Sequence, residues 1–367
     1  MRQRHGLSVV LATLASTGFA ACSSSGGAMT VVDGATGAVD AQSAGGTTGK
    51  GGTTGTGGTT STGGATSTSP QFPSCVGLPA TCGPKGNESC CTSLLVPGGT
   101  FYRTYDGGYY NDMGYPATVS DFYMDKFEIT VGRFRQFVNA GKGTQTSPPA
   151  AGDGEHPLIP DSGWNTAWNT NLPATASALM AALKSRSSYY QTWTDTAGGN
   201  ESRPINYITW YDAFAFCAWD GGRLATEAEW NYAAAGGSEQ RCYPWSSPAS
   251  STTIDHSYAR YYDGLALTAI LSVVGSTPSG NGKWGHADLA GNVDEWVRDS
   301  YSDPYTVPCD DCASLIVANP TLNPDDRAVR GGSFRENTSV LLSAHRGAGS
   351  STERDDYLGA RCVRDSL

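Results

Sequence analysis

The chain has 367 residues, of which 38% are hydrophobic and 16% are charged, and its formal net charge is −10. This acidic balance excludes nucleic acid as an expected partner and excludes electrostatic docking on anionic lipid. The 47 glycines and 19 prolines favour a loop-rich fold, in which the 18 tyrosines and 9 tryptophans supply much of the buried area.

The N-terminus has the features of a bacterial lipoprotein export signal. Arg2 and Arg4 precede a short apolar run at 7–14, and "GFAAC" places small residues before Cys22. The run is too short to span a bilayer. We therefore predict a signal peptide at residues 1–21 and lipidation of Cys22, with a plain secretory signal as the alternative.

The following segment, residues 22–70, consists almost entirely of Gly, Ser, Thr and Ala and reads as a disordered tether. Its r.m.s. reach is about 35–40 Å. Ser23 after the lipidated cysteine resembles an outer-membrane sorting signal. We expect a lipoprotein of the bacterial cell envelope, held at the outer membrane by its lipid and facing the periplasm or the exterior. A merely tolerated low-complexity insert is the alternative for the tether.

The chain has ten cysteines, and in an exported protein these are expected to form disulfides. Setting Cys22 aside leaves nine, an odd number that implies a free thiol or an intermolecular bond. Residues 71–93 contain four of them and are predicted to be a disulfide-bonded segment, whose disulfide connectivity the sequence does not determine. A zinc site is the alternative reading of these four. They are Cys75, Cys82, Cys90 and Cys91.

A folded domain is expected over residues 94–367. "LLVPGGTFYRTY" and "DFYMDKFEIT" are predicted to be strands. Thr130 is the predicted N-cap residue of a helix over "VGRFRQFVNAG" that ends at Gly141. The apolar face of that helix is predicted to contain Phe134, Phe137 and Val138.

Two further helices carry stronger signals. Thr209 with Asp212 in the first turn predicts the start of one, and Thr226 with Glu229 forms a capping box for the next. Glycine pairs follow each helix and predict its end. Because short helices and strands do not alternate regularly, the pattern predicts an α+β fold that is loop-rich and low in regular secondary structure.

Several motifs occur together in order: "VPGGTF", "PINYITWYDAFAFCAWDGGRLATEAEWNYAAAGG", "DLAGNVDEWVRD", "RGGSF" and "LGARCVR". Together they resemble the formylglycine-generating enzyme family, also called sulfatase-modifying factors, over roughly Leu94 to Asp365. The resemblance implies a fold similar to a C-type-lectin-like domain, often with bound calcium.

The resemblance also implies a chemistry, which depends on two residues. Enzymes of the family oxidise a sulfatase cysteine to formylglycine with oxygen and a copper ion held by two cysteines after "RGGSF". The matching positions here are Glu336 and Leu341. Because Cu(I) requires soft thiolates, we expect no copper and assign no catalytic residue.

The remaining cysteines do not offer an obvious replacement. Cys309 and Cys312 in "CDDC" form either a dithiol or, as favoured in an exported protein, a disulfide with each other or with Cys242. The resemblance implies that Cys217 pairs with Cys362.

A calcium site is expected at "DLAGNVDEW". Asp288 and Glu295 offer hard carboxylate oxygens, and Gly291 and Val293 offer backbone carbonyls. These four positions match a calcium site of the family, which we expect to be structural. The alternative is a simple turn, with Glu295 solvated or paired with a nearby arginine such as Arg298.

Polar residues around "RGGSF" define a candidate groove for a peptide or glycan ligand. Alternatively, the arginines of this group simply pair with the surplus of carboxylates in the chain. The groove residues are Arg330, Ser333, Arg335, Glu336, His345 and Arg346.

Two functional hypotheses follow. The first is a monomeric surface lipoprotein whose domain binds a ligand or supports the envelope without oxidation. The second is a formylglycine-generating oxidase with an unrecognised metal site. The second needs two reduced cysteines near the groove, and the sequence favours the first.

Overall fold

The computed structural model describes residues 72–184, 189–265, 271–316, 319 and 321–367. The predicted signal peptide, Cys22 and the tether lie outside the described residues. Within the described part of the chain, no helix has the length and apolar character needed to cross a membrane.

Short helices and short strands are separated by long irregular segments in the described chain, and the predicted α+β class is confirmed. The α-helices are α1 Val131–Asn139, α2 Ala176–Ala182, α3 Trp210–Trp219 and α4 Glu227–Ala234. Single 3₁₀ segments occur at Pro73–Cys75, Thr166–Asn171, Gly237–Glu239 and Pro278–Gly280. The strands are β1 Ser93–Val96, β2 Gly99–Tyr105, β3 Asn111–Val119, β4 Phe122–Asp125, β5 Arg223–Leu224, β6 Asp294–Ser300, β7 Asp326–Arg330, β8 Gly347–Ser350, β9 Leu358–Gly359 and β10 Cys362–Arg364.

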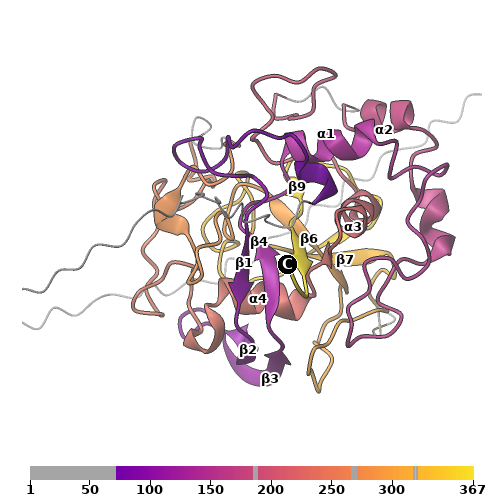
Figure 1. Ribbon diagram of the computed structural model, residues 1–367. Helices are drawn as coiled ribbons and strands as arrows, with labels where there is room; N and C mark the ends of the chain where they lie inside the picture. Colours follow the sequence, from indigo (N-terminus) through magenta and orange to yellow (C-terminus); the bar gives the residue numbers. More distant parts are fainter. Residues whose placement is uncertain (1–71, 185–188, 266–270, 317–318, 320) are drawn as a thin grey trace, which may run out of the picture. The chain divides into compact units, whose positions relative to one another are not determined.

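The strands form three sheets that bring distant parts of the chain together. One sheet has the order β1-β4-β10-β5, a second is the β2-β3 hairpin, and a third has the order β8-β7-β6-β9. Figure 1 shows β1 beside β4, with the β2-β3 hairpin beyond their ends. In the third sheet β6 pairs antiparallel with β7 and parallel with β9, so that Asp294 lies opposite Leu358. This sheet positions the candidate site.

The three predicted helix starts are confirmed. Thr130 accepts a hydrogen bond from the backbone of Arg133 at the start of α1. The helices α3 and α4 each begin with a complete capping box, in which two backbone donors are satisfied reciprocally. Gly221 follows α3 and Gly236 follows α4 with positive φ values of 76° and 65°, a conformation in which glycine carries no Cβ penalty.

Helix α4 is buried along its whole length, and this burial has a consequence for charge. All eight of its residues are buried, including Glu227 and Glu229. A buried carboxylate must be paired or hydrogen-bonded, because leaving it isolated from water is costly. We therefore expect arginine side chains to be buried beside α4 as partners of these carboxylates.

Four disulfides form among the described cysteines, and the structure resolves the connectivity that the sequence left open. Cys217 of α3 is bonded to Cys362 of β10, which is the pairing that the family resemblance implies. Among the cysteines in the described residues, only Cys242 is free, and it is buried. The other bonds are Cys75–Cys91, Cys82–Cys90 and Cys309–Cys312.

Candidate functional site

Two of the six predicted groove residues belong to the core instead. Arg330 is 1% exposed, and its Nε donates to the Glu227 carboxylate at 3.1 Å. Arg346 binds the same carboxylate through its Nε at 2.8 Å and Nη2 at 2.6 Å. Their assignment to a ligand groove was wrong, because buried Glu227 on α4 needs both guanidinium groups as partners.

Ser333 and Arg335 make contacts within the protein. Ser333 is fully buried, and its backbone N–H and hydroxyl donate to Oε2 of Glu336 at 2.9 and 3.1 Å. The side chain of Arg335 is 44% exposed and pairs with Asp356. Neither residue is among those that line the cavity at Glu336.

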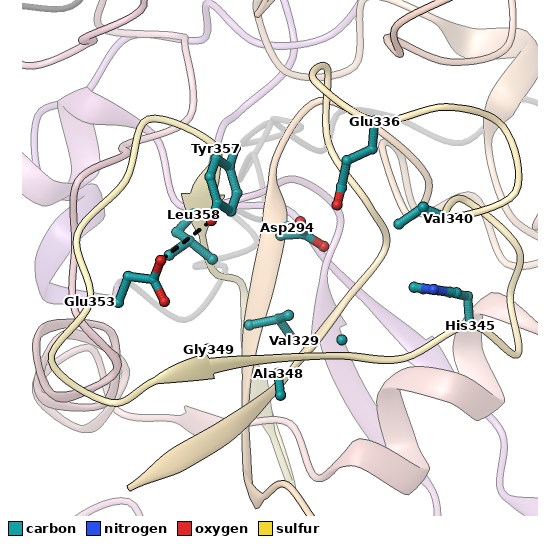
Figure 2. A pocket seen from close by; sticks show the side chains of 11 residues that line it. Asp294, Val329, Glu336, Val340, His345, Ala348, Gly349, Glu353, Tyr357 and Leu358 are labelled. Carbon is teal, nitrogen blue, oxygen red and sulfur yellow. Dashed lines mark hydrogen bonds between the residues drawn. The ribbon is translucent and has the colours of Figure 1, made fainter. Parts of the chain in front are cut away.

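Glu336 and His345 do line a cavity, of about 120 Å³. Figure 2 shows the carboxyl groups of Asp294 and Glu336 turned toward each other, and the His345 ring directed at the same space. Two further acidic residues, Asp294 and Glu353, were not predicted from the sequence. The full lining is Asp294, Val329, Glu336, Val340, His345, Gly347, Ala348, Gly349, Glu353, Tyr357 and Leu358.

Asp294 and Glu336 form a hydrogen-bonded carboxyl pair. Asp294, at the start of β6, is 5% exposed, and its Oδ1 accepts a hydrogen bond from the backbone of Gly332 at 2.9 Å. Burial, and then the charge of Glu336, holds the pKa of Asp294 well above its usual range. Proton uptake by Asp294 is therefore favoured relative to an exposed aspartate.

The other polar groups of the cavity add no positive charge. Burial, and then the nearby Arg330 guanidinium, lowers the pKa of His345, so its ring is neutral near pH 7. Glu353 accepts hydrogen bonds from the Tyr357 hydroxyl at 3.4 Å and from the backbone of Ser350 at 3.3 Å. No lysine or arginine occurs among the residues that line the cavity.

The residues at the family's copper positions do not fit copper. Leu341 is fully buried in an apolar cluster, and Glu336 is a hard oxygen ligand in the acidic cavity. Cys242, the free thiol of the described residues, hydrogen-bonds to the carbonyl of Asp106 at 3.3 Å. Burial, followed by the charge of Asp106, raises the pKa of Cys242 to about 12. The described chain thus offers no pair of thiolates for Cu(I).

The expected calcium residues lie together in the interior. Glu295 accepts hydrogen bonds from Arg361, with Nη2 at 2.5 Å, and from the indole of Trp230 at 2.8 Å. Asp288 accepts from the backbone of Gly275 at 2.5 Å. Glu295 is thus paired with an arginine, as the alternative interpretation had it, but the partner is Arg361. The Arg298 guanidinium lies over the rings of three aromatic side chains instead. These are Trp168, Trp210 and Phe214.

A third buried carboxylate, Glu128, adds to this negative charge. It accepts hydrogen bonds from Asn292 at 2.6 Å and from the backbone of Val293 at 3.2 Å. Burial, and then the charges of Asp288 and Glu295, holds the pKa of Glu128 well above its usual range. Burial likewise raises the pKa of Asp288.

The side chains at the expected calcium site carry hard oxygens, the donor type that calcium takes, and three acids surround one guanidinium, that of Arg361. Gly291 is required at its position, because a Cβ there would lie 2.3 Å from the carbonyl oxygen of Arg260. Among the described residues, no cluster of three or more His, Cys, Asp or Glu side chains has the geometry of a metal site. A calcium ion would therefore depend on the backbone carbonyls of Gly291 and Val293 as well.

Comparison with known proteins identifies the family. Residues 79–366 match the model of the sulfatase-modifying factor enzyme 1-like domain. The chain therefore belongs to this family, as the motifs predicted. A solved structure, PvdO from Pseudomonas aeruginosa, superposes with a TM-score of 0.51 at 22% identity, over 76% of this chain and 95% of that one. That likeness shows the fold alone.

Two mouse relatives carry different names. The chain is 28% identical over 292 residues to a formylglycine-generating enzyme of Mus musculus, covering 74% of each chain. It is 31% identical over 226 residues to a protein of the same organism named inactive C-alpha-formylglycine-generating enzyme 2, covering 56% of this chain and 68% of the relative. The family thus includes proteins named as active and as inactive.

Proposed function

We propose that this chain is a ligand-binding member of the family that does not generate formylglycine. The observation that carries the proposal is the pair of residues at the copper positions. Glu336 contributes a carboxylate to an acidic cavity, and Leu341 is fully buried among apolar side chains. A relative whose printed name includes "inactive" supports the idea that a domain of this family persists without the reaction.

The proposal includes a location and a mode of attachment. Cys22 carries lipid that anchors the chain in the bacterial outer membrane, and residues 22–70 hold the domain away from the membrane surface. The module acts as a monomer and takes a peptide or glycan ligand from the periplasm or the exterior. The support for this part is the order of signal, cysteine and low-complexity segment in the sequence.

A structural calcium ion forms part of the same proposal. Asp288 and Glu295 would hold it with the carbonyls of Gly291 and Val293, and its charge would offset the excess of buried carboxylates. The ion would stabilise the turn that leads into β6, which carries Asp294 of the cavity.

The test is turnover. The full chain is incubated with copper, oxygen and a Cys-x-Pro-x-Arg peptide, and aldehyde formation is followed by mass spectrometry, with the mouse formylglycine-generating enzyme as the positive control. We expect no aldehyde from this chain under conditions in which the control converts the peptide. Conversion by this chain would overturn the proposal and establish the oxidase alternative.

A further inference from the structure

The cavity at Glu336 has an unbalanced charge. Glu336 and Glu353 contribute carboxylates, the Asp294 carboxyl lies between Glu336 and the backbone of Gly332, and the His345 ring opposes them. The hydrogen bonds that Glu336 and Glu353 accept come from backbone N–H groups and hydroxyl groups. No cationic side chain lines the space, so a positively charged ligand would meet oxygens that carry no competing ion pair.

The nearest arginines are committed elsewhere. The side chain of Arg330 is fully buried and binds Glu227 and the carbonyl oxygen of His345. Arg335 binds Asp356. Moving Arg330 into the cavity would remove one of the two guanidinium groups that bind buried Glu227, and moving Arg335 would remove the guanidinium that binds buried Asp356. Loss of a partner from a buried ion pair is destabilising. The cavity therefore cannot be neutralised from within by these residues.

The walls of the cavity are apolar and lack bulky side chains on one edge. Val329, Val340 and Leu358 line it together with the Tyr357 ring, and strand β8 contributes Gly347 and Gly349. A Cβ at Gly349 would lie 3.1 Å from Oε2 of Glu353 and 2.8 Å from the Trp296 ring. Glycine at this position keeps the space beside Glu353 open.

The volume limits the ligand to a few atoms. About 120 Å³ is somewhat less than the roughly 150 Å³ cavity that accepts a benzene molecule of six heavy atoms. A sugar ring with its hydroxyl groups is larger, whereas an unbranched stem of four methylenes with a terminal ammonium has five heavy atoms. A compact ammonium is also a point charge that several carboxylate oxygens can share, unlike a planar guanidinium.

We propose that this cavity binds a primary alkylammonium group, such as the end of a lysine side chain, with the stem against Val329, Val340 and Leu358 and the ammonium at Glu336 and Glu353. The proposal rests on the proposed binding function and names the ligand chemistry of that site. A lysine within a peptide and a free alkyl amine share this chemistry, and the experiment distinguishes them.

The experiment titrates the full chain with Nα-acetyl-lysine N-methylamide and with pentylamine, using calorimetry or chemical-shift changes. The Nε-acetylated lysine derivative is the matched neutral control. We expect the lysine derivative to bind at least tenfold more tightly than its Nε-acetylated form. Tighter binding of the lysine derivative than of pentylamine identifies a peptide as the source, and the reverse identifies a free amine.

Two variants locate the site. Glu336→Gln and Glu353→Gln should each weaken ammonium binding at least tenfold while the far-UV spectrum and melting cooperativity are retained. Glu239→Gln is the control, because Glu239 is a partly exposed residue that pairs with Lys283 and Arg241 outside the cavity, and its affinity should match that of the native chain.

Two outcomes would overturn the inference: equal affinity for the charged and neutral lysine derivatives, or unchanged affinity in both cavity variants. Neither outcome concerns the proposed function, which fails only if the chain forms aldehyde from the sulfatase-type peptide. The two failures are therefore distinguishable.

Discussion

Two buried groups of charges in this protein are built differently. Between α1, β4, α3 and β10, Arg133 and Arg364 face Asp125 and Asp220, and all four side chains are buried. Arg133 donates to Asp125 at 2.7 Å and to Asp220 at 2.5 Å. Two cations thus balance two anions. The cavity at Glu336, in contrast, has acidic residues and no lysine or arginine in its lining.

The pKa shifts report this difference. Burial acts against ionisation of Asp125, yet Arg133 and Arg364 outweigh it and lower the pKa of that carboxyl. At Asp294 burial is reinforced by Glu336, and the pKa rises. The pKa of a buried aspartate is thus shifted in opposite directions in the two regions. We expect the balanced cluster to contribute to stability, and we propose a ligand only for the unbalanced cavity.

The largest expected effect comes from the covalent link to the balanced cluster. The Cys217–Cys362 bond joins α3 to β10, next to Arg364, and its cysteines are 145 residues apart. Replacing both cysteines with alanine should lower the free energy of unfolding by about 5 kcal/mol in the chain-entropy model. Denaturant unfolding of the native chain and the double variant measures this difference in the free energy of unfolding.

The Cys309–Cys312 bond is the matched control, because it closes a loop of only 3 residues. Its removal should cost about 2 kcal/mol in the same model. Equal costs for the two bonds would show that loop closure does not explain their contribution.

The next largest effect on stability is expected from removing one charge of the balanced cluster. Arg133→Met should lower the free energy of unfolding by about 3–5 kcal/mol, because it leaves Asp125 and Asp220 with a single buried guanidinium, that of Arg364. Thermal or denaturant unfolding provides the measurement. Lys184→Met is the control, since its partner Asp195 is 63% exposed and solvent screens the pair, so the change should be far smaller. A similar cost for both variants would contradict the assigned role of Arg133.

A third prediction tests the pH dependence of a buried acid. Burial, and then the charge of Glu227, raises the pKa of Asp299 from 3.8 to about 6. The folded protein therefore binds more protons than the unfolded chain between these values, so stability falls as pH rises from about 4 to 6. The contribution is at most about 3 kcal/mol.

Replacing the acid isolates this contribution. Asp299→Asn should reduce the loss of unfolding free energy between pH 4 and pH 6, measured by denaturant titration at several pH values. Asp299 accepts one hydrogen bond on each carboxylate oxygen, from the backbone N–H groups of Glu227 and Ser314. The Asn side chain has a single acceptor oxygen and can therefore keep only one of these two bonds. An unchanged slope in the variant would assign the pH dependence to other groups.

The smallest effect on stability is expected in the unbalanced region. Glu336→Gln removes a charge beside Asp294 and keeps an oxygen that can accept from Ser333. The free energy of unfolding should change by no more than about 1 kcal/mol, because relief of repulsion offsets a weaker hydrogen bond. A melting experiment near neutral pH measures this. A loss as large as that of Arg133→Met would make Glu336 a structural residue.

Local signals in the sequence predicted the helices, and distant contacts explain what was missed. Thr130, Thr209 and Thr226 were recognisable because a cap depends on residues three positions away. Arg330 and Arg346 were misassigned because their partner Glu227 lies more than 100 residues earlier in the chain. No local pattern shows that α4 is buried on all sides.

Asp294 carried a signal that was overlooked. In β6 successive side chains point to opposite faces, so a Glu295 directed toward Arg361 places Asp294 on the face of Glu336. The pairing itself depends on a loop some 40 residues later, which the sequence pattern does not place. The expected calcium ligands lie together in the interior, and their occupancy stays a prediction.

The central claim is that Glu336 and Leu341 remove the copper site and leave an acidic cavity in its place. The most direct test is a Cu(I) titration against a chromophoric chelator, comparing the native chain with the Glu336→Cys/Leu341→Cys variant. The account predicts that the native chain takes no stoichiometric copper from the chelator, whereas the variant gains affinity for the ion. One equivalent of tightly bound Cu(I) in the native chain would contradict it.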